Sequence, residues 1–218
     1  MNPLIDKMKS TGRALALFGL VGAGLVTLSY QLTYAKIEEN ERETLLRSLN
    51  VIVDKSLYDN DLFGDTITVQ NEAFLGVDTP MVIHRARKAD KAVAVVINTV
   101  APDGYNGRMH LVVGIDFSGK ILGVRVVKHK ETPGLGDYVE IQRSNWVTSF
   151  NGHTLNNPKK EQWGVKRDGG IFDQFTGATI TPRAVVKAVH KSLLFYKQYR
   201  DELFVTPSTP MEVTKIDK

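Results

Sequence analysis

The longest apolar stretch of the chain lies near its start, where no charged side chain occurs from Ala14 to Ala35. A helix rises 1.5 Å per residue, so this stretch spans about 33 Å, enough to cross a bilayer. Thr33-Tyr34-Ala35 also resembles the end of a cleaved signal peptide, but the apolar run is long for one. We predict a transmembrane helix at residues 14–35, preceded by a cytoplasmic tail at residues 1–13.

Apolar residues then recur every three or four positions among charged ones. They are Leu45, Leu46, Leu49, Ile52 and Val53. This spacing places them on one helix face. We predict that residues 36–65 form a linker with an amphipathic helix that packs on the following domain.

A series of short β-branched, apolar runs follows, separated by turn residues. The runs are residues 66–69, 81–84, 92–100, 110–116 and 121–127. Regular spacing of this kind predicts a meandering antiparallel sheet. We expect the basic residues Arg85, Arg87, Lys88 and Lys91 to form a solvated turn.

The pattern in the last third of the chain predicts two helices. Residues 138–150 predict a short helix with Trp146 packed inward. Thr181 followed by Pro182 reads as an N-cap and a first helical residue. Apolar residues recur at helical spacing after them, so we expect that helix to run to about Leu203. The domain then covers residues 66–204, and residues 205–218 form a flexible tail.

These elements predict an α+β fold, with an N-terminal transmembrane helix before a domain whose mainly antiparallel sheet is flanked by helices. The 218 residues are 42% hydrophobic and 24% charged, which is typical of a globular chain. The net charge of +4 is spread without a block of like charges, which argues against nucleic-acid binding.

The composition limits the chemistry. The chain has no cysteine, which excludes disulfides, Fe–S clusters and thiolate metal sites. Its five histidines are scattered without metal-ligand spacing, so we expect no metal site. The sequence also lacks G-x-S-x-G, P-loop and G-x-G-x-x-G motifs. We expect no catalytic residue here, and any redox chemistry would require a bound cofactor.

Threonines gather at the start of the last helix. Thr176, Thr179 and Thr181 precede or begin it, and Gly177 provides backbone freedom for a bend. A helix N-terminus with free N–H groups and hydroxyls is suited to bind a phosphate. An ordinary capped helix has the same spacing, so the pattern by itself leaves both interpretations open.

Two motifs carry a family resemblance. Asp173-x-x-Thr176-Gly177-Ala178-Thr179 resembles the D-x-x-[S/T]-G-A-T signature of the FMN-binding domain shared by the G subunit of Rnf complexes and the C subunit of the Na⁺-pumping NADH:quinone reductase. The stretch from Glu131 to Gly136 resembles the E-T-P-G-L-G loop of the same family. The resemblance implies FMN linked to Thr179 through a phosphoester bond that a flavin transferase forms.

The resemblance also implies which other residues lie beside the flavin. In the loop these are Glu131, Thr132, Leu135 and Gly136, and in a Gly-Tyr-x-Gly stretch Tyr105. Pro133 and Gly134 suit the central positions of a type II turn, which would hold the loop over a flat ring. Lys128, Lys166 and Arg167 are candidates for a cation near the ring, although surface charge is the commoner role.

The resemblance favours the G subunit of a membrane Rnf complex. Because the sequence lacks a nicotinamide motif, we expect the chain to relay electrons and to have no NADH dehydrogenase activity of its own. It implies an inner-membrane protein with its FMN domain on the periplasmic side and other Rnf subunits as partners. Two alternatives remain open, namely the C subunit of the Na⁺-pumping reductase and a non-redox, membrane-tethered module for another phosphate-bearing ligand.

Overall fold

Two compact units divide the chain, Met1–Leu45 and Leu46–Lys218. The computed structural model describes the backbone of residues 3–205 and 213–215. It describes their side chains except those of residues 3–7, 10, 35, 37–48, 50 and 213–215. The helix α1 (Pro3–Ile52) forms the first unit from Pro3 onward and continues into the second.

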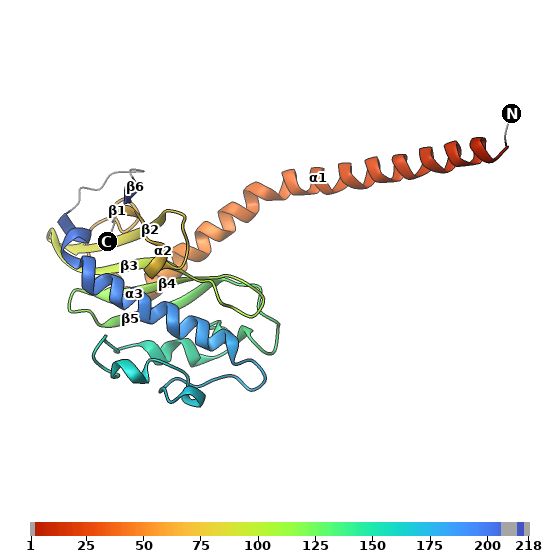
Figure 1. The fold of residues 1–218 in the computed structure, drawn as a ribbon. Coiled ribbons are helices and arrows are strands. Elements are labelled where there is room, and N and C mark those ends of the chain that lie inside the picture. The colour runs from red at the N-terminus through yellow and green to blue at the C-terminus, as the bar shows by residue number, and fades with distance from the viewer. Residues whose placement is uncertain (1–2, 206–212, 216–218) are drawn as a thin grey trace. The chain divides into compact units, whose positions relative to one another are not determined.

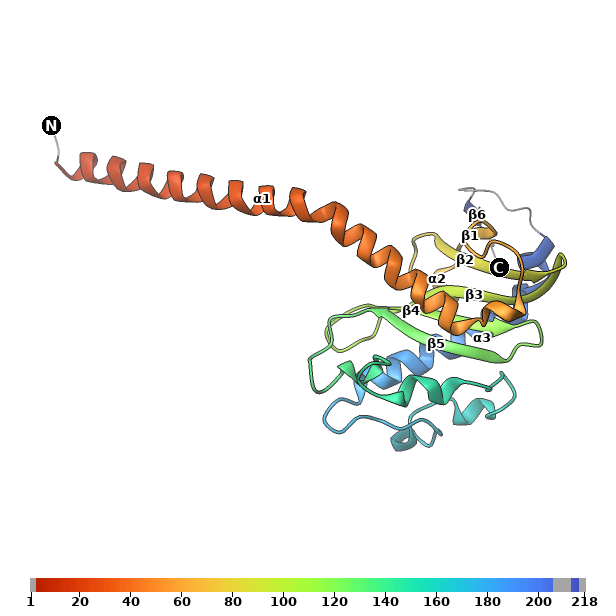
Figure 2. The same cartoon turned by 180° about the vertical axis from the view of Figure 1, so that it is seen from behind.

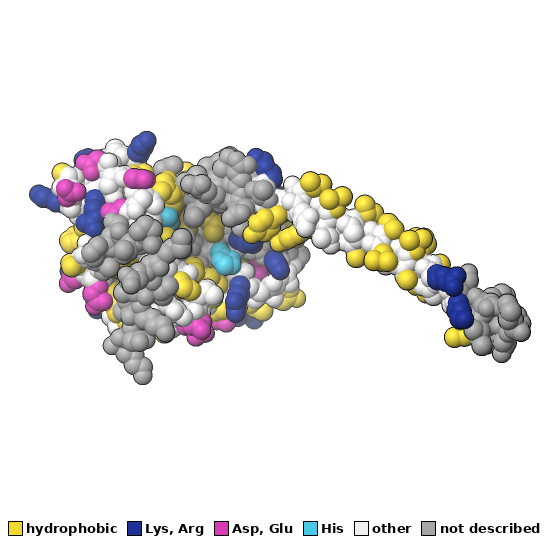
Figure 3. All heavy atoms as spheres, turned by 90° about the horizontal axis from the view of Figure 1, so that it is seen from above, with side chains coloured by type: hydrophobic (Ala, Val, Ile, Leu, Met, Phe, Trp, Pro, Cys, Tyr) yellow, Lys and Arg dark blue, Asp and Glu magenta, His cyan; other side chains and the backbone are white. Residues whose placement is uncertain are grey.

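The first unit contains a helix stretch that is long and apolar enough to cross a membrane. This stretch is Thr11–Tyr34, and none of its side chains is buried. On the face that Figure 3 shows, apolar side chains occur along the whole of this stretch, and basic side chains lie near its beginning. Apolar surface without a protein partner is typical of a lipid-facing helix. Length and composition therefore agree with the predicted span at residues 14–35.

The second unit is built on a six-stranded sheet with the order β5-β4-β3-β2-β1-β6. Its strands are β1 (Thr66–Gln70), β2 (Met81–Lys88), β3 (Lys91–Ala101), β4 (Met109–Asp116), β5 (Ile121–Lys128) and β6 (Val213–Lys215). Neighbouring strands from β1 to β5 are antiparallel, which confirms the predicted meander.

The sixth strand differs from the expected flexible tail. β6 pairs with β1 in parallel, with Val213 opposite Thr68 and Lys215 opposite Gln70. An edge strand leaves unpaired backbone groups that a short segment can satisfy. The remaining tail residues, 206–212 and 216–218, lie outside the described part of the chain.

Helices cover both faces of the sheet. The helix α3 (Ile180–Val205) packs across one face, and the last turn of α1 lies on the other (Figures 1 and 2). The buried face of α3 includes Val185, Val189 and Leu193, in the same core cluster as Val95 and Val113 of the sheet. The predicted helix to about Leu203 is therefore confirmed.

The last turn of α1 fits against two paired glycines. Gly114 of β4 lies opposite Gly123 of β5. A Cβ atom on Gly114 would clash with Ile52 Cγ2, so this side chain occupies the space that the glycines leave. Leu49 and Val53 are also buried, as the apolar spacing predicts. The side chains of residues 45 and 46 lie outside those described.

The prediction of a solvated basic turn was wrong for Arg85 and Arg87, which lie in β2. Only 1% of Arg85 is exposed, and its guanidinium lies 2.5 Å from Asp65 Oδ1. It also donates a hydrogen bond to the Leu203 carbonyl, and Arg87 donates one to the Phe204 carbonyl. The final carbonyls of a helix lack intrahelical donors, and these side chains supply them. Lys88 and Lys91 are exposed, as expected.

The expected helix at residues 138–150 consists of two short 3₁₀ helices, η2 (Asp137–Val139) and η3 (Asn145–Phe150). Residues 140–144 separate them, and the Ser144 hydroxyl accepts a hydrogen bond from the Trp146 N–H and so caps η3. Trp146 packs edge-on against Phe150 and Phe175, as predicted. The other short helices are α2 (Glu72–Leu75), η1 (Lys55–Leu57), η4 (Lys160–Gln162) and η5 (Lys166–Asp168).

A buried histidine makes stability depend on pH. His84 is 5% exposed in β2, and its Nδ1 lies 3.1 Å from the Leu62 carbonyl oxygen. Burial lowers the pKa of His84 below its ordinary value of 6.5, against a smaller raising effect of the Leu62 hydrogen bond. The unfolded chain therefore binds this proton at higher pH than the folded chain. The contribution of His84 to the free energy of unfolding is therefore fully present above about pH 6.5, and it is lost as the pH falls toward the lowered pKa of the folded chain.

We expect His84→Gln to weaken this acid dependence. Urea unfolding of both proteins from about pH 8 to about pH 5 would measure the slope of the free energy of unfolding against pH. The pKa of His190 is also lowered, mainly by burial, but this residue is present in both proteins and cancels in the comparison. Identical slopes would contradict the assignment to His84.

Candidate functional site

Two tight turns of the same design meet at the site. In the first, the Leu135 N–H donates to the Thr132 carbonyl, and Gly134 has φ of 77°. This geometry confirms the predicted turn at Pro133 and Gly134 and fits type II. In the second, the Ala178 N–H donates to the Phe175 carbonyl, and Gly177 has φ of 80°.

Both turns use glycine at the third position because a positive φ strains residues that carry a Cβ atom. They also touch each other. A Cβ atom built on Gly177 would lie 3.4 Å from Leu135 Cδ2. The E-T-P-G-L-G loop and the D-x-x-T-G-A-T segment are far apart in the sequence, yet they form neighbouring walls of one site.

The helix α3 begins earlier than the sequence predicts. Its first residue is Ile180, so Thr179 immediately precedes it, and the Thr179 carbonyl accepts from the Arg183 N–H at 3.4 Å. Thr181 was predicted to be the N-cap, but it lies inside the first turn and is 0% exposed. Its hydroxyl donates to Glu131 instead of capping the helix. A tertiary contact therefore sets its role.

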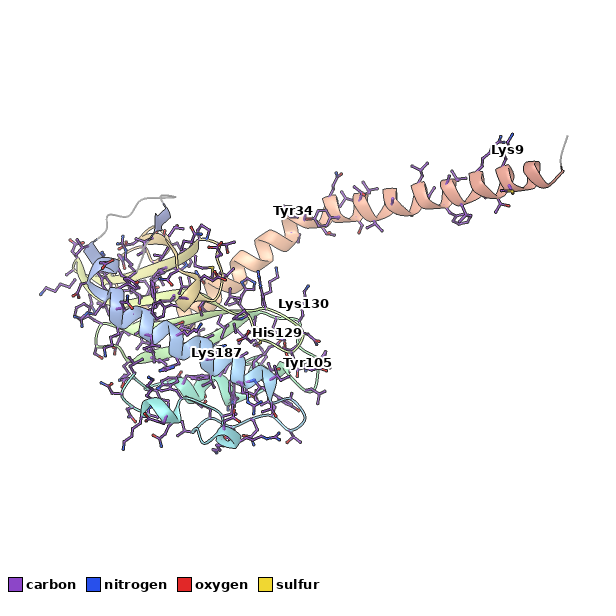
Figure 4. The ribbon with its side chains drawn as sticks, in the orientation of Figure 1. Lys9, Tyr34, Tyr105, His129, Lys130 and Lys187 are labelled. Atoms are coloured by element: carbon purple, nitrogen blue, oxygen red, sulfur yellow. The ribbon has the colours of Figure 1, made fainter. Side chains whose placement is uncertain are left out.

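A pocket of about 220 Å³ opens where these segments meet. Its lining comes from the loop at residues 131–136, the helix start and the turn after β3. The lining residues are Tyr105, Glu131, Thr132, Leu135, Gly136, Gly177, Ala178, Thr179, Ile180 and Thr181. Tyr105 lies at the same end of the domain as His129 and the beginning of α3 (Figure 4). Eight of the ten residues that we predicted for the site therefore line one pocket.

Glu131 is the one charged side chain among the described residues that line the pocket. It is 5% exposed, and both of its carboxyl oxygens accept hydrogen bonds. The Asn106 N–H donates to Oε1 at 3.0 Å, and the Thr181 hydroxyl donates to Oε2. Burial of a carboxylate is costly unless hydrogen bonds compensate it, and these two donors do so.

Two predicted residues, Asp173 and Thr176, are not part of the described lining. The Asp173 carboxylate lies 2.6 Å from Lys166 Nζ, and both side chains are more than half exposed. Its backbone carbonyl accepts a hydrogen bond from Trp146 Nε1 at 2.7 Å. Asp173 therefore fixes the segment before the turn, and Thr176 lies exposed at the tip of the turn.

The three cations proposed for the ring do not line the pocket either. Lys166 pairs with Asp173, as described above. At the helix start, Arg183 donates two hydrogen bonds to Asp168, at 2.5 and 2.6 Å. These bonds hold the pKa of the Asp168 carboxyl below its ordinary value. Among the described lining residues, the only charged side chain is therefore the acidic Glu131.

Several supporting residues were missed at the sequence level. Asn106 Nδ2 donates to the Thr132 hydroxyl at 3.0 Å, in addition to its backbone bond to Glu131. His129 Nδ1 accepts from the Glu131 N–H at 3.0 Å, and its Nε2 lies 2.7 Å from Glu140. Asn106 lies within the Gly-Tyr-x-Gly stretch and His129 lies two residues before the E-T-P-G-L-G loop, but only the fold shows which partners they contact.

The residues present fit the parts of an FMN molecule. Thr179 offers a hydroxyl beside a helix N-terminus, where free N–H groups and the helix dipole favour a phosphate. Leu135 and Tyr105 are 44% and 66% exposed and offer apolar surface to a flat ring. Pockets that enclose a whole ligand usually measure about 300–1,000 Å³. A pocket of 220 Å³ would therefore leave part of the FMN molecule exposed.

Comparisons with known proteins agree with this assignment. The family model of the FMN-binding domain matches residues 104–194, and that of the RnfG N-terminal region matches residues 1–52. The chain thus combines an FMN-binding domain with an N-terminal membrane-type helix, which defines its class.

Curated relatives define the family more closely. The chain is 46% identical over 202 residues to the G subunit of the ion-translocating oxidoreductase complex of Shewanella piezotolerans, covering 93% of this chain and 95% of that protein. The corresponding G subunits of Shewanella amazonensis and Vibrio cholerae are 48% and 43% identical over 196 and 205 residues. These alignments cover 90% and 94% of this chain and 91% and 98% of the relatives. The chain belongs to the family formed by the G subunits of ion-translocating oxidoreductase complexes.

Proposed function

We propose that this chain is the flavin-carrying subunit of a membrane-bound, ion-translocating electron-transport complex of the Rnf type. It relays electrons through FMN attached to Thr179 by a phosphoester bond, and a flavin transferase makes the attachment. The observation that supports this proposal most directly is the convergence of two separate motifs on one pocket that Thr179 lines. The names of the relatives and the FMN-binding domain match support the same function.

Each wall of the pocket has a distinct part in this proposal. The start of α3 holds the phosphate through free N–H groups, next to the Thr179 hydroxyl. The turn at Thr132–Leu135 presents an apolar side chain to the ring, and Gly134 and Gly177 provide the positive φ that the two turns require. When bound, FMN supplies a centre that accepts and gives up electrons. A shallow pocket keeps one edge of the ring accessible to partners.

The proposed place of the domain is the periplasmic side of a bacterial inner membrane, with Thr11–Tyr34 as a single span. Long domains translocate largely regardless of their charge, so the short N-terminal tail with Lys7, Lys9 and Arg13 stays in the cytoplasm. A tether of this kind raises the concentration of the domain near the other subunits of the complex.

Reporter fusions test this topology. We expect a fusion at Lys55 and one at Lys218 to be active with a periplasmic reporter and inactive with a cytoplasmic one. We expect N-terminal sequencing to show that the purified protein retains the apolar stretch. A mature chain that begins at Lys36 would show that the stretch is a cleaved signal peptide, and cytoplasmic reporter activity would reverse the orientation.

Reduction experiments test the relay. The sequence lacks a G-x-G-x-x-G nicotinamide motif, so electrons are expected to come from another carrier. We expect the flavin on the purified full-length chain to be bleached by dithionite and to remain oxidised when NADH is added, as stopped-flow absorbance would record. The assembled complex with NADH is the positive control. Rapid bleaching by NADH alone would make the chain a dehydrogenase in its own right.

A further inference from the structure

We infer that Glu131 is a positioning residue for flavin attachment, because it ties together the segments that hold the Thr179 hydroxyl at the pocket. The inference rests on the proposed attachment of FMN to Thr179. Only 5% of Glu131 is exposed, and its carboxylate contacts two other segments of the chain. Glu131 acts by holding these segments in place, and its partners, a backbone N–H and a hydroxyl, are neutral donors.

The two oxygens of the carboxylate reach in different directions. Oε1 accepts from the Asn106 N–H in the turn after β3, at 3.0 Å. Oε2 accepts from the Thr181 hydroxyl in the first turn of α3. Glu131 itself belongs to the E-T-P-G-L-G loop, so one side chain joins all three segments of the pocket wall.

The backbone is packed closely around this side chain. A Cβ atom on Gly136 would lie 2.8 Å from both Cβ and Oε2 of Glu131. A Cβ atom on Gly104 would lie 3.0 Å from Oε1 and would clash with the Gly107 carbonyl oxygen. Because the interior is close-packed, a Cβ atom at Gly136 would require the Glu131 side chain to move, and one at Gly104 would require the backbone at Gly107 to move.

The same bond distinguishes the threonines of the segment. The Thr181 hydroxyl is fully buried and donates to Glu131, so it is engaged. Thr176 is exposed outside the described lining. Thr179 is half-buried and lines the pocket. Because Thr179 lies two residues before Thr181, a fixed Thr181 side chain limits where the Thr179 hydroxyl can lie.

The attachment step requires accurate placement of that hydroxyl. Joining FMN itself to a hydroxyl would require the loss of water, so the donor is an activated flavin, a flavin dinucleotide. The Thr179 oxygen bonds to the phosphorus of its FMN half, the pyrophosphate bond breaks, and the nucleoside monophosphate leaves. The hydroxyl proton passes to solvent, and no electron is transferred. Displacement of a reacting group by 1 Å costs about 100-fold in rate.

Flavin attachment by the transferase, measured on the full-length chain in detergent, tests the inference. Glu131→Ala removes both acceptors, and Thr181→Val removes the hydroxyl but keeps the shape. We expect both to slow attachment roughly 10- to 100-fold at saturating transferase. Thr181→Ser keeps the donor and should restore the rate. Lys130→Gln changes the exposed neighbour of Glu131 and should behave as the wild type.

Hydrogen–deuterium exchange on the flavin-free proteins provides a second measurement. The Asn106 amide should exchange faster in Glu131→Ala than in the wild type and Lys130→Gln, because its acceptor is lost. All rates are compared below the melting temperature of the least stable variant. A wild-type attachment rate in Thr181→Val, or an equally slow Thr181→Ser, would overturn the inference.

The two proposals fail differently. A wild-type chain that takes up no flavin, or one whose flavin lies elsewhere than on Thr179, would contradict the proposed function. Unchanged exchange at Asn106 in Glu131→Ala would contradict the positioning role whether or not flavin is attached. Normal attachment in the wild type together with normal attachment in Glu131→Ala would contradict the positioning role alone.

Discussion

Thr179→Val should abolish covalent flavin in a host that expresses the transferase. The substitution keeps the size and β-branching of the side chain but removes the oxygen that forms the phosphoester. Thr179 lines the pocket directly before the first residue of α3. A phosphate attached there would meet the free N–H groups of the helix start. Intact mass and in-gel fluorescence of the denatured protein would measure the loss.

Thr176→Val is the matched control for this experiment. It removes a hydroxyl from the same turn, but Thr176 is exposed and lies outside the described lining of the pocket. We therefore expect this variant to keep its flavin, and peptide mapping should locate the added mass on Thr179. Flavin retained in Thr179→Val, or lost only in Thr176→Val, would move the attachment site to Thr176.

Asp65→Ala should lower the free energy of unfolding of the domain by about 3–5 kcal/mol, because removal of one partner leaves a buried charge uncompensated. Asp65 is 15% exposed and lies 2.5 Å from Arg85 and 2.8 Å from Arg87. Burial lowers the pKa of Arg85, and the nearby Asp65 charge opposes that effect. Urea unfolding followed by circular dichroism would measure the change.

Two further variants define the cause. Lys187→Met breaks an exposed ion pair with Asp103, whose side chains are 58% and 56% exposed, and should change stability little. Asp65→Leu combined with Arg85→Met replaces the ion pair by apolar side chains and should recover part of the loss. An Asp65→Ala protein as stable as the wild type would show that Arg85 has no need of this carboxylate.

Much of the fold could be predicted because the pattern of apolar residues is local. The regularly spaced β-branched runs predict a meandering antiparallel sheet, and the 3.6-residue spacing after Thr181 predicts the long helix. Arg85 and Arg87 were predicted incorrectly because charge normally indicates exposure. Their guanidinium groups instead bind carbonyls at the end of α3, more than 100 residues away in the chain. Local spacing contains no information about such a partner.

The two glycine turns could be predicted for the same reason. The E-T-P-G-L-G and D-x-x-T-G-A-T segments each form a glycine turn whose geometry depends on a few adjacent residues. The site residues in these segments, including Thr179 and Glu131, were named from the resemblance of the two motifs to those of a known family. Asp173 was also predicted to belong to the site. The sequence does not show that its carboxylate pairs with Lys166 or that its backbone carbonyl accepts a hydrogen bond from Trp146.

The sequence by itself determined the apolar helix, the order of the strands from β1 to β5 and the two turns. It did so because periodicity and turn chemistry depend on near neighbours. Only the tertiary structure decided that the two turns meet, that Thr181 is bound by Glu131, and that Glu131 is the charge facing the pocket. Those features depend on contacts between residues 25–50 positions apart. Packing of the sheet against α3 creates these contacts, and no local pattern encodes them.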